Sequence, residues 1–88
     1  DLFSSELIAD DLNLISVPKI EGKMRVKAKV RYRHTEQPAT VEQLDEKRIH
    51  VIFDEPQRAI TKGQAVVLYD GDVVVGGATI CDTVSLER

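Results

Sequence analysis

The alternation of apolar and polar positions is clearest in residues 23–33. Met24, Val26, Ala28, Val30 and Tyr32 are apolar, and every residue beside them is basic: Lys23, Arg25, Lys27, Lys29, Arg31 and Arg33. Successive side chains of a β-strand point to opposite faces. The pattern therefore predicts one long strand with a buried face and a uniformly cationic face.

Shorter strands are predicted after it. His34 to Pro38 should turn, and residues 39–44 read as a strand whose Val41 faces the core. Residues 45–47 have the length of a hairpin loop. Beyond them, Ile49, Val51 and Phe53 form the apolar face of a third strand.

The strongest turn signals lie in residues 53–80. Asp70 and Gly71 predict a tight turn with positive φ between a strand at 66–69 and a returning strand at 73–75. Gly76 and Gly77 favour a bulge or a close backbone approach. A phosphate-cradling loop would need a helix N-terminus or a longer glycine-rich loop, and no helical period follows. A last strand is predicted at 78–84.

The first sixteen residues are less regular. Their apolar positions have near-helical spacing at first and alternate from Leu12, which predicts a short turn or helix at 4–9 and a strand at 12–15. Residues 17–22 contain Pro and Gly and read as a connection. We therefore expect residues 1–16 to lead into a barrel formed by residues 17–88.

Six or seven short strands with frequent turn signals predict an all-β barrel or sandwich. The chain has 88 residues, which is one domain with a modest core. Closing the sheet into a small antiparallel barrel would remove the exposed edges of an open sheet. We therefore expect a single small β-barrel domain.

Composition is that of a globular domain, with 42% hydrophobic and 31% charged residues. No apolar run approaches a membrane span of about 18 residues, so the expected location is cytoplasmic. The lone cysteine, Cys81, fits a reducing compartment. The chain begins at Asp1 rather than Met, which suggests a piece of something longer.

The net charge of −3 argues mildly against a dedicated nucleic-acid binder, but the charge is unevenly distributed. Residues 19–33 hold seven basic side chains and one acid, so this segment is +6 and the remainder is −9. Such a cationic face could bind phosphates. The alternative is a solvated strand face paired with acids of neighbouring strands, such as Glu42, Asp45 or Asp54.

The sequence gives little support for a catalytic or metal site. Cys81 stands between Ile80 and Asp82 in a predicted strand rather than in a cationic setting that would activate a thiol. His34, His50 and Cys81 lack metal-ligand spacing, and no Ser-His-Asp order or carboxylate pair stands out. We expect neither a catalytic residue nor a metal site in this chain.

A wider motif carries a family resemblance. It comprises Arg31, Tyr32 and Arg33, followed by Phe53, Pro56, Gln57, Ala59, Thr61, Gly63, Gln64, Tyr69, Gly76, Gly77 and Ile80. In this spacing it resembles the C-terminal domain of bacterial tRNA-specific 2-thiouridylases, also labelled tRNA 5-methylaminomethyl-2-thiouridylate methyltransferases. The resemblance extends through nearly the whole chain, and it implies a six-stranded barrel similar to the second domain of translation elongation factors.

The resemblance also implies a function for the complete enzyme. Members of the family use ATP, with magnesium, to adenylate the wobble uridine of tRNA and then replace an oxygen with sulfur from a donor protein. Their nucleotide-binding motif, SGGVDS, and their two catalytic cysteines belong to an N-terminal catalytic domain and are absent from these residues. This chain alone is therefore expected to be inactive and to contact tRNA.

Three residues are expected at the tRNA contact because of the resemblance. Arg31 and Tyr32 would lie beside the anticodon region, with Gln64 as a further contact; Arg25, Lys27, Lys29 and Arg33 would add the phosphate-binding charge. Alternatively, Tyr32 belongs to the core and Gln64 stabilises a turn. A protein-interaction or spacer barrel without RNA contact is the competing function.

Overall fold

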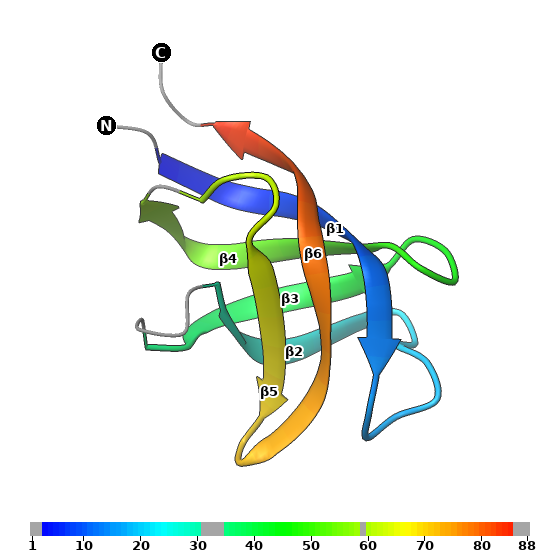
Figure 1. Cartoon of the computed structure of the whole chain (residues 1–88). Helices are drawn as coiled ribbons and strands as arrows, with labels where there is room; N and C mark the ends of the chain where they lie inside the picture. The colour runs from blue at the N-terminus through cyan, green and yellow to red at the C-terminus, as the bar shows by residue number, and fades with distance from the viewer. Residues whose placement is uncertain (1–2, 31–34, 59, 86–88) are drawn as a thin grey trace.

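The computed structural model describes residues 3–30, 35–58 and 60–85, which form six strands (Figure 1). These are β1 (Phe3–Leu14), β2 (Lys23–Lys29), β3 (Gln37–Gln43), β4 (Ile49–Arg58), β5 (Ala65–Asp70) and β6 (Val73–Ser85). They pair antiparallel in the order β1-β4-β3-β2-β5-β6, and β6 returns to β1 to close a barrel. The predicted all-β, six-stranded barrel is thus confirmed.

The interior is filled by the alternate side chains of every strand, as expected for a narrow barrel. Within β2, Val26 and Ala28 are buried while the lysines beside them point outward. The buried hydrophobic residues are Leu7, Ala9, Leu12, Ile20, Val26, Ala28, Ala39, Val41, Ile49, Val51, Phe53, Ile60, Val66, Leu68, Val75, Ala78 and Ile80. None of the described residues forms a helix long and apolar enough to cross a membrane.

The expected helix at 4–9 is wrong, because these residues belong to β1. Leu7 and Ala9 alternate inward, but the next buried residue is Leu12. Asp11 between them has a φ of 56°, and the register with β6 shifts between Asp10 and Asn13. This bulge adds one residue to the alternation after Ala9. The near-helical spacing lies earlier, at Phe3, Leu7 and Ile8, where β1 also shifts register between Ser4 and Glu6. The segment expected to lead into the barrel supplies one of its strands.

The middle strands largely follow the prediction. Val41 is buried in β3, residues 45–47 connect β3 to β4, and Ile49, Val51 and Phe53 face the core. The predicted strand at 23–33 is shorter, because β2 ends at Lys29 and Val30 lies in a bend. The final part of that prediction, residues 31–33, lies outside the described residues.

The β5–β6 hairpin is present, but its turn lies one residue later than predicted. Asp70 pairs with Val73, so Gly71 and Asp72 form the loop. Only Gly71 of these two has a positive φ, at 62°, as in the first central position of a type II′ turn. The strands predicted at 73–75 and 78–84 are one continuous strand, β6, which passes through both glycines.

The predicted close backbone approach at the glycine pair is confirmed. A Cβ atom on Gly76 would lie 2.6 Å from the backbone oxygen of Asn13 in β1. The ladder with β5 also shifts register between Leu68 and Tyr69, opposite this part of β6. The absence of a side chain at Gly76 therefore lets β1 and β6 lie close together where the barrel closes.

Candidate nucleic-acid interface

Four basic side chains on the outside of β2 form what we call the cationic face: Lys23, Arg25, Lys27 and Lys29. The first three are exposed and Lys29 is half-buried. They share one side of the strand because Val26 and Ala28, which lie between them, point into the core. This part of the predicted face is confirmed.

Arg25 is already paired with an acid. Its two terminal nitrogens donate to the two carboxylate oxygens of Asp54, each at 2.7 Å, and Nη1 also donates to Thr40 Oγ1 at 2.9 Å. The hydrogen bond to Asp54 raises the pKa of Arg25, and the same bond lowers that of Asp54. Arg25 thus reaches across β3 to β4, and a phosphate would compete with Asp54 for it.

The N-terminal end of the cationic face, at Lys23, also lies near acidic side chains. Lys23 lies opposite Glu42 of β3, and Glu42 lies opposite His50 of β4. His50 Nε2 is 2.9 Å from Glu6 Oε1 of β1. At Arg25 the structure therefore agrees with the alternative that a neighbouring carboxylate balances the strand's charge. Lys23 has an acid opposite it but forms no ion pair within the described residues.

Lys27 and Lys29 have different neighbours. Lys27 lies opposite Pro38 on one side and Tyr69 on the other, and Lys29 lies opposite Val67. Among residues 3–30, 35–58 and 60–85, neither lysine forms an ion pair. Lys27 and Lys29, in the C-terminal half of β2, can therefore offer their charge to a ligand.

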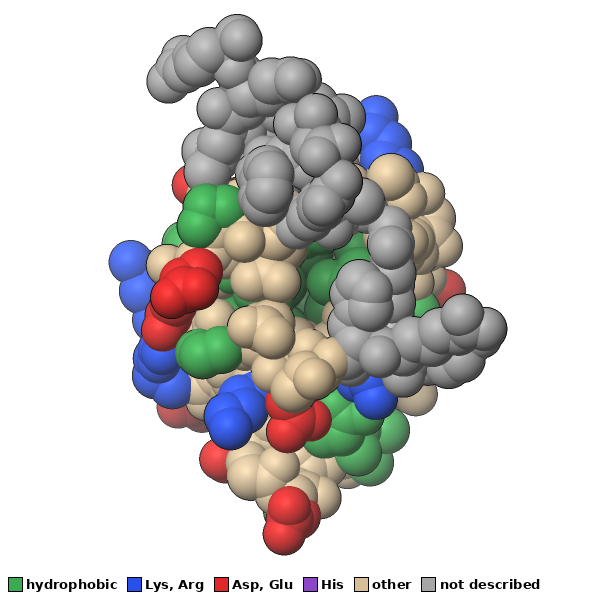
Figure 2. All heavy atoms as spheres, turned by 90° about the vertical axis from the view of Figure 1, so that its left-hand side faces the viewer, with side chains coloured by type: hydrophobic (Ala, Val, Ile, Leu, Met, Phe, Trp, Pro, Cys, Tyr) green, Lys and Arg blue, Asp and Glu red, His purple; other side chains and the backbone are tan. Residues whose placement is uncertain are grey.

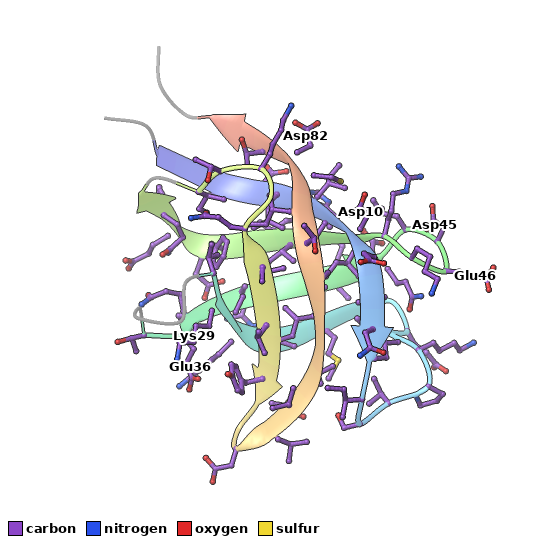
Figure 3. The ribbon with its side chains drawn as sticks, viewed as in Figure 1. Asp10, Lys29, Glu36, Asp45, Glu46 and Asp82 are labelled. Carbon is purple, nitrogen blue, oxygen red and sulfur yellow. The ribbon has the colours of Figure 1, made fainter. Side chains whose placement is uncertain are left out.

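The acids gather elsewhere. In Figure 3, Asp10, Asp45 and Glu46 lie around the β3–β4 loop, whereas Lys29 lies at the opposite end of β2, with Glu36 near it. Figure 2 shows one end of the barrel, where basic and acidic side chains are interspersed. The charge separation in the sequence is therefore only partly preserved on the surface.

Gln64 stabilises a turn, as the alternative interpretation predicted. Its side-chain oxygen accepts a hydrogen bond from the Thr61 backbone N–H at 3.0 Å. Its backbone oxygen accepts from Ile80 N–H at 2.8 Å. Val67 lies opposite Lys29 in the β2–β5 pair. Gln64 precedes Val67 by three residues, which corresponds to about 10 Å of extended chain. Its amide nitrogen is the group that could still contact a ligand there.

Comparison with known proteins identifies the domain. Residues 4–80 match the family model described as the aminomethyltransferase β-barrel domain. The chain belongs to this family.

Its similar relatives include tRNA-specific 2-thiouridylases. The chain is 56% identical over 80 residues to the tRNA-specific 2-thiouridylase MnmA of Clostridioides difficile strain 630 and 54% identical to that of Acetivibrio thermocellus. Each match covers 91% of this chain and 22% of the relative. The resemblance to the C-terminal domain of bacterial tRNA-specific 2-thiouridylases is thereby confirmed, and the chain spans about a fifth of the relatives' length.

The positions that the family resemblance singled out are only partly within the described structure. Gln64 is described, whereas Arg31, Tyr32 and Arg33 lie outside the described residues. Their placement and their expected contacts therefore stay predictions.

Sequence reasoning named Tyr69 only as part of the family motif and did not assign it to the tRNA contact. Tyr69 is half-buried on the outside of β5, directly across the strand pair from Lys27. The sequence did not show that Tyr69 faces outward, because residues 65–69 are all apolar and either side of the strand could have been buried. The structure buries Val66 and Leu68, so Val67 and Tyr69 point outward. What the sequence could not supply was the β2–β5 pairing that brings Tyr69 beside a lysine.

A hollow of about 610 Å³ lies where β1 ends near the β3–β4 loop. Its lining includes Leu14, Pro18, Leu44 and Glu46.

Within the part of the chain that the structure describes, no group of three or more His, Cys, Asp or Glu side chains could hold a metal ion. Cys81 is partly buried in β6.

Proposed function

We propose that this chain is the tRNA-contacting accessory domain of an ATP-dependent tRNA 2-thiouridylase that thiolates the wobble uridine. Its family membership and its similarity to tRNA-specific 2-thiouridylases support the parent activity. The observation that carries the contact role is Lys27 and Lys29, two lysines on the outside of one strand without an ion pair among the described residues. Such charges bind phosphates irrespective of base sequence.

The domain's contribution in this proposal is positioning. Holding the anticodon region against a distant catalytic domain makes the reaction effectively intramolecular without any reacting group in the barrel. The catalytic N-terminal domain and the sulfur-donor protein would be partners of the complete enzyme. Its location would be the cytoplasm.

ATP and magnesium do not fit the residues of this barrel. Gly76 and Gly77 lie within β6, where Gly76 already abuts Asn13 of β1, and neither precedes a helix that could bind a phosphate. The described residues also lack a cluster of oxygen ligands for a metal. In our proposal, both would bind in the rest of the enzyme.

The test is tRNA affinity of the complete polypeptide that carries this chain, measured over a range of salt concentrations. Changing Lys27 and Lys29 to Ala should weaken binding up to about tenfold for each phosphate contact near 0.1 M salt. The plot of log association constant against log salt concentration has a negative slope, and the magnitude of this slope should decrease by about 0.7 to 0.9 for each lost contact.

A matched control changes Lys19 and Lys47 to Ala. Both are exposed, the net charge changes equally, and neither belongs to the cationic face. If the two double variants behave alike, the contact is nonspecific. Unchanged affinity and slope in the Lys27 and Lys29 variant would overturn the RNA role.

The second candidate is a protein-interaction or spacer barrel without RNA contact. The pairing of Arg25 with Asp54 and the position of Lys23 opposite Glu42 favour it, because they place carboxylates beside half of the cationic face. It predicts no change in tRNA affinity for the Lys27 and Lys29 variant. The same experiment therefore separates the two functions.

A further inference from the structure

The outer surface of β5 brings an aromatic ring to the unpaired end of the cationic face. Tyr69 and Val67 point outward because Val66 and Leu68, each fully buried, occupy the inward positions. Across the β2–β5 pair, Lys27 lies opposite Tyr69 and Lys29 opposite Val67. Directly opposite side chains on a sheet face have Cβ atoms about 5 Å apart.

We propose that Tyr69 is a stacking platform for an unpaired nucleotide of the bound RNA, with Lys27 and Lys29 binding the adjoining phosphates. The proposal rests on the RNA-contacting function proposed above and specifies which part of the RNA the barrel would hold. Base stacking on an aromatic ring needs a single-stranded or splayed-out nucleotide, because bases inside a duplex are already stacked.

The spacing suits this ligand. Lys27 and Lys29 are two residues apart on one face of β2, about 7 Å along the strand, so their flexible side chains can reach neighbouring phosphates. Tyr69 lies at the level of Lys27. A nucleotide stacked on its ring would therefore have a cation beside its backbone.

Tyr69 is not needed to satisfy a buried polar group. Its side chain is only partly buried, and its hydroxyl makes no hydrogen bond to another described residue. A buried tyrosine hydroxyl usually has such a partner. Within the described residues the hydroxyl thus has no partner, and the exposed part of the side chain faces the outside of the barrel.

Nearby acids define the direction of approach. Asp70 and Asp72 flank Gly71 at the tip of the β5–β6 hairpin, and Glu36 lies near Lys29 (Figure 3). These carboxylates would repel phosphates beyond the two ends of the lysine pair. The contact with the RNA backbone is therefore expected to be limited to the few phosphates beside Lys27 and Lys29.

The chain offers a direct reporter of stacking. It contains no tryptophan and only two tyrosines, Tyr32 and Tyr69. In the 88-residue chain carrying Tyr32→Phe and labelled with 3-fluorotyrosine, the single ¹⁹F resonance comes from Tyr69. The probes are a single-stranded RNA of seven uridines and an abasic ribose-phosphate oligomer of the same length.

Stacking predicts a saturable upfield shift of this resonance with the uridine oligomer and none with the abasic one, which should also bind about tenfold more weakly. Tyr69→Phe keeps the ring and should bind the uridine oligomer like the background protein. Tyr69→Leu keeps an apolar side chain but removes the ring, so it should bind about tenfold more weakly. Thermal unfolding verifies that each variant is folded.

Two outcomes overturn the stacking role. One is equal binding of the uridine oligomer by the Tyr69→Phe and Tyr69→Leu variants, and the other is the same ¹⁹F response to both probes. The Lys27 and Lys29 double variant separates this failure from that of the proposed function. If that variant loses tRNA affinity while Tyr69→Leu does not, the RNA contact stands and the stacking platform does not; if neither loses affinity, both fail.

Discussion

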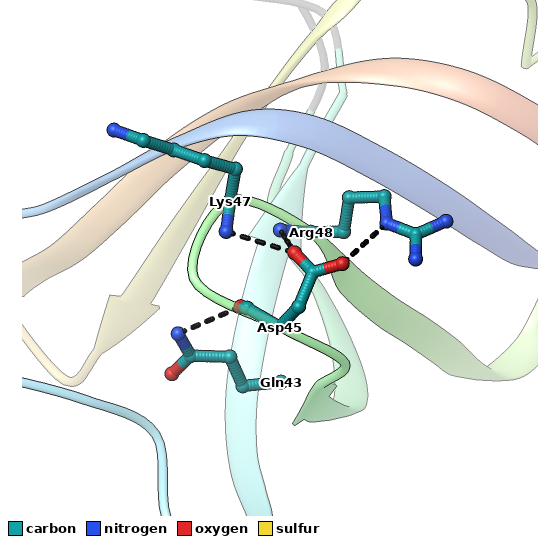
Figure 4. A network of polar contacts seen from close by, with 4 residues as sticks. All are labelled: Gln43, Asp45, Lys47 and Arg48. Atoms are coloured by element: carbon teal, nitrogen blue, oxygen red, sulfur yellow. Dashed lines mark hydrogen bonds and ion pairs between the residues drawn. The ribbon is translucent and has the colours of Figure 1, made fainter.

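At the scale of single residues, Asp45 organises the loop between β3 and β4 (Figure 4). Its Oδ1 accepts hydrogen bonds from the backbone N–H groups of Lys47 and Arg48, each at 2.9 Å, and its Oδ2 accepts from Arg48 Nε at 2.7 Å. The backbone N–H of Lys47, followed by the Arg48 side chain, lowers the pKa of Asp45 below the ordinary value of 3.8. The loop therefore favours the charged carboxylate.

This gives a pH prediction for Asp45→Asn. Because the folded protein holds the proton less tightly than the unfolded chain, Asp45 stabilises the fold at neutral pH, and this contribution is lost as the pH falls below 3.8 through the lowered pKa. The stability difference between the native protein and the variant should therefore shrink in acid. Urea unfolding at a series of pH values measures it.

Glu46→Gln is the control for Asp45→Asn. Glu46 is an exposed acid of the same loop and makes no hydrogen bond to another described residue. Its substitution should have little effect at any pH. A stability difference for Asp45→Asn that is constant from neutral pH to acid would contradict the predicted role of the carboxylate charge.

The glycine pair permits a second test at this scale. A Cβ atom on Gly76 would lie 2.6 Å from the Asn13 backbone oxygen, so Gly76→Ala should push β1 and β6 apart and destabilise the protein by about 1–3 kcal/mol. Gly77→Ala is the matched control, because its nearest contact, the Val66 backbone oxygen, is at an ordinary 3.5 Å. The control should lie within about 0.5 kcal/mol of the native protein. Equal midpoints of denaturant unfolding for the two variants would contradict this account.

At the scale of elements, β1 depends on the bulge at Asp11. The positive φ of this residue shifts the alternation, so that Ala9 and Leu12 both face the core although three positions separate them. Without the shift, Leu12 would point into solvent. The bulge therefore lets one strand pair with β4 along its first part and continue along β6 to its end.

Substitutions at position 11 test the bulge. Asp11→Val should destabilise the protein by about 1–3 kcal/mol, because a β-branched side chain is strained at positive φ. Asp11→Asn should remain close to the native stability, since asparagine tolerates this conformation. Thermal unfolding of the two variants measures the difference. If valine is tolerated as well as asparagine, the backbone at this position is not the one described.

At the scale of the whole molecule, the distribution of charge follows from which strands the barrel makes neighbours. Arg25 reaches Asp54, which is 29 residues away in sequence, because β2, β3 and β4 are adjacent. The pair is partly exposed, with 60% and 44% of the two side chains accessible. An exposed pair contributes little to stability, but it removes one cation from the surface available to RNA.

Asp54→Asn should therefore strengthen tRNA binding if the proposed function holds. Releasing Arg25 adds one cation next to Lys27. The negative slope of log association constant against log salt concentration should therefore become steeper by about 0.7 to 0.9. Glu46→Gln makes the same change in net charge within the β3–β4 loop and should alter affinity much less. Salt titrations of the complete polypeptide compare them. An equal gain from both variants would mean that net charge alone, rather than Arg25, is responsible.

The strands that alternate regularly could be predicted from sequence. Val26 and Ala28 inside β2, with basic residues outside, follow from the two-residue period of a strand, and the same holds for Val41 and Val51. The elements predicted wrongly are those in which the backbone departs from this period. β1 shifts register between Ser4 and Glu6 and again at Asp11, so its apolar residues do not follow a two-residue period. The hairpin turn lies at Gly71 and Asp72, one residue later than predicted.

The amino-acid sequence by itself determined the class of fold, the family and the basic character of one face of β2, because each depends on local periodicity or on a motif. Tertiary structure alone decided which charges remain free. Asp54 neutralises Arg25, whereas Lys27 and Lys29 meet Pro38, Val67 and Tyr69. The physical reason is that a side chain's electrostatic environment is set by cross-strand neighbours, and the order in which a barrel closes cannot be read from one strand's pattern.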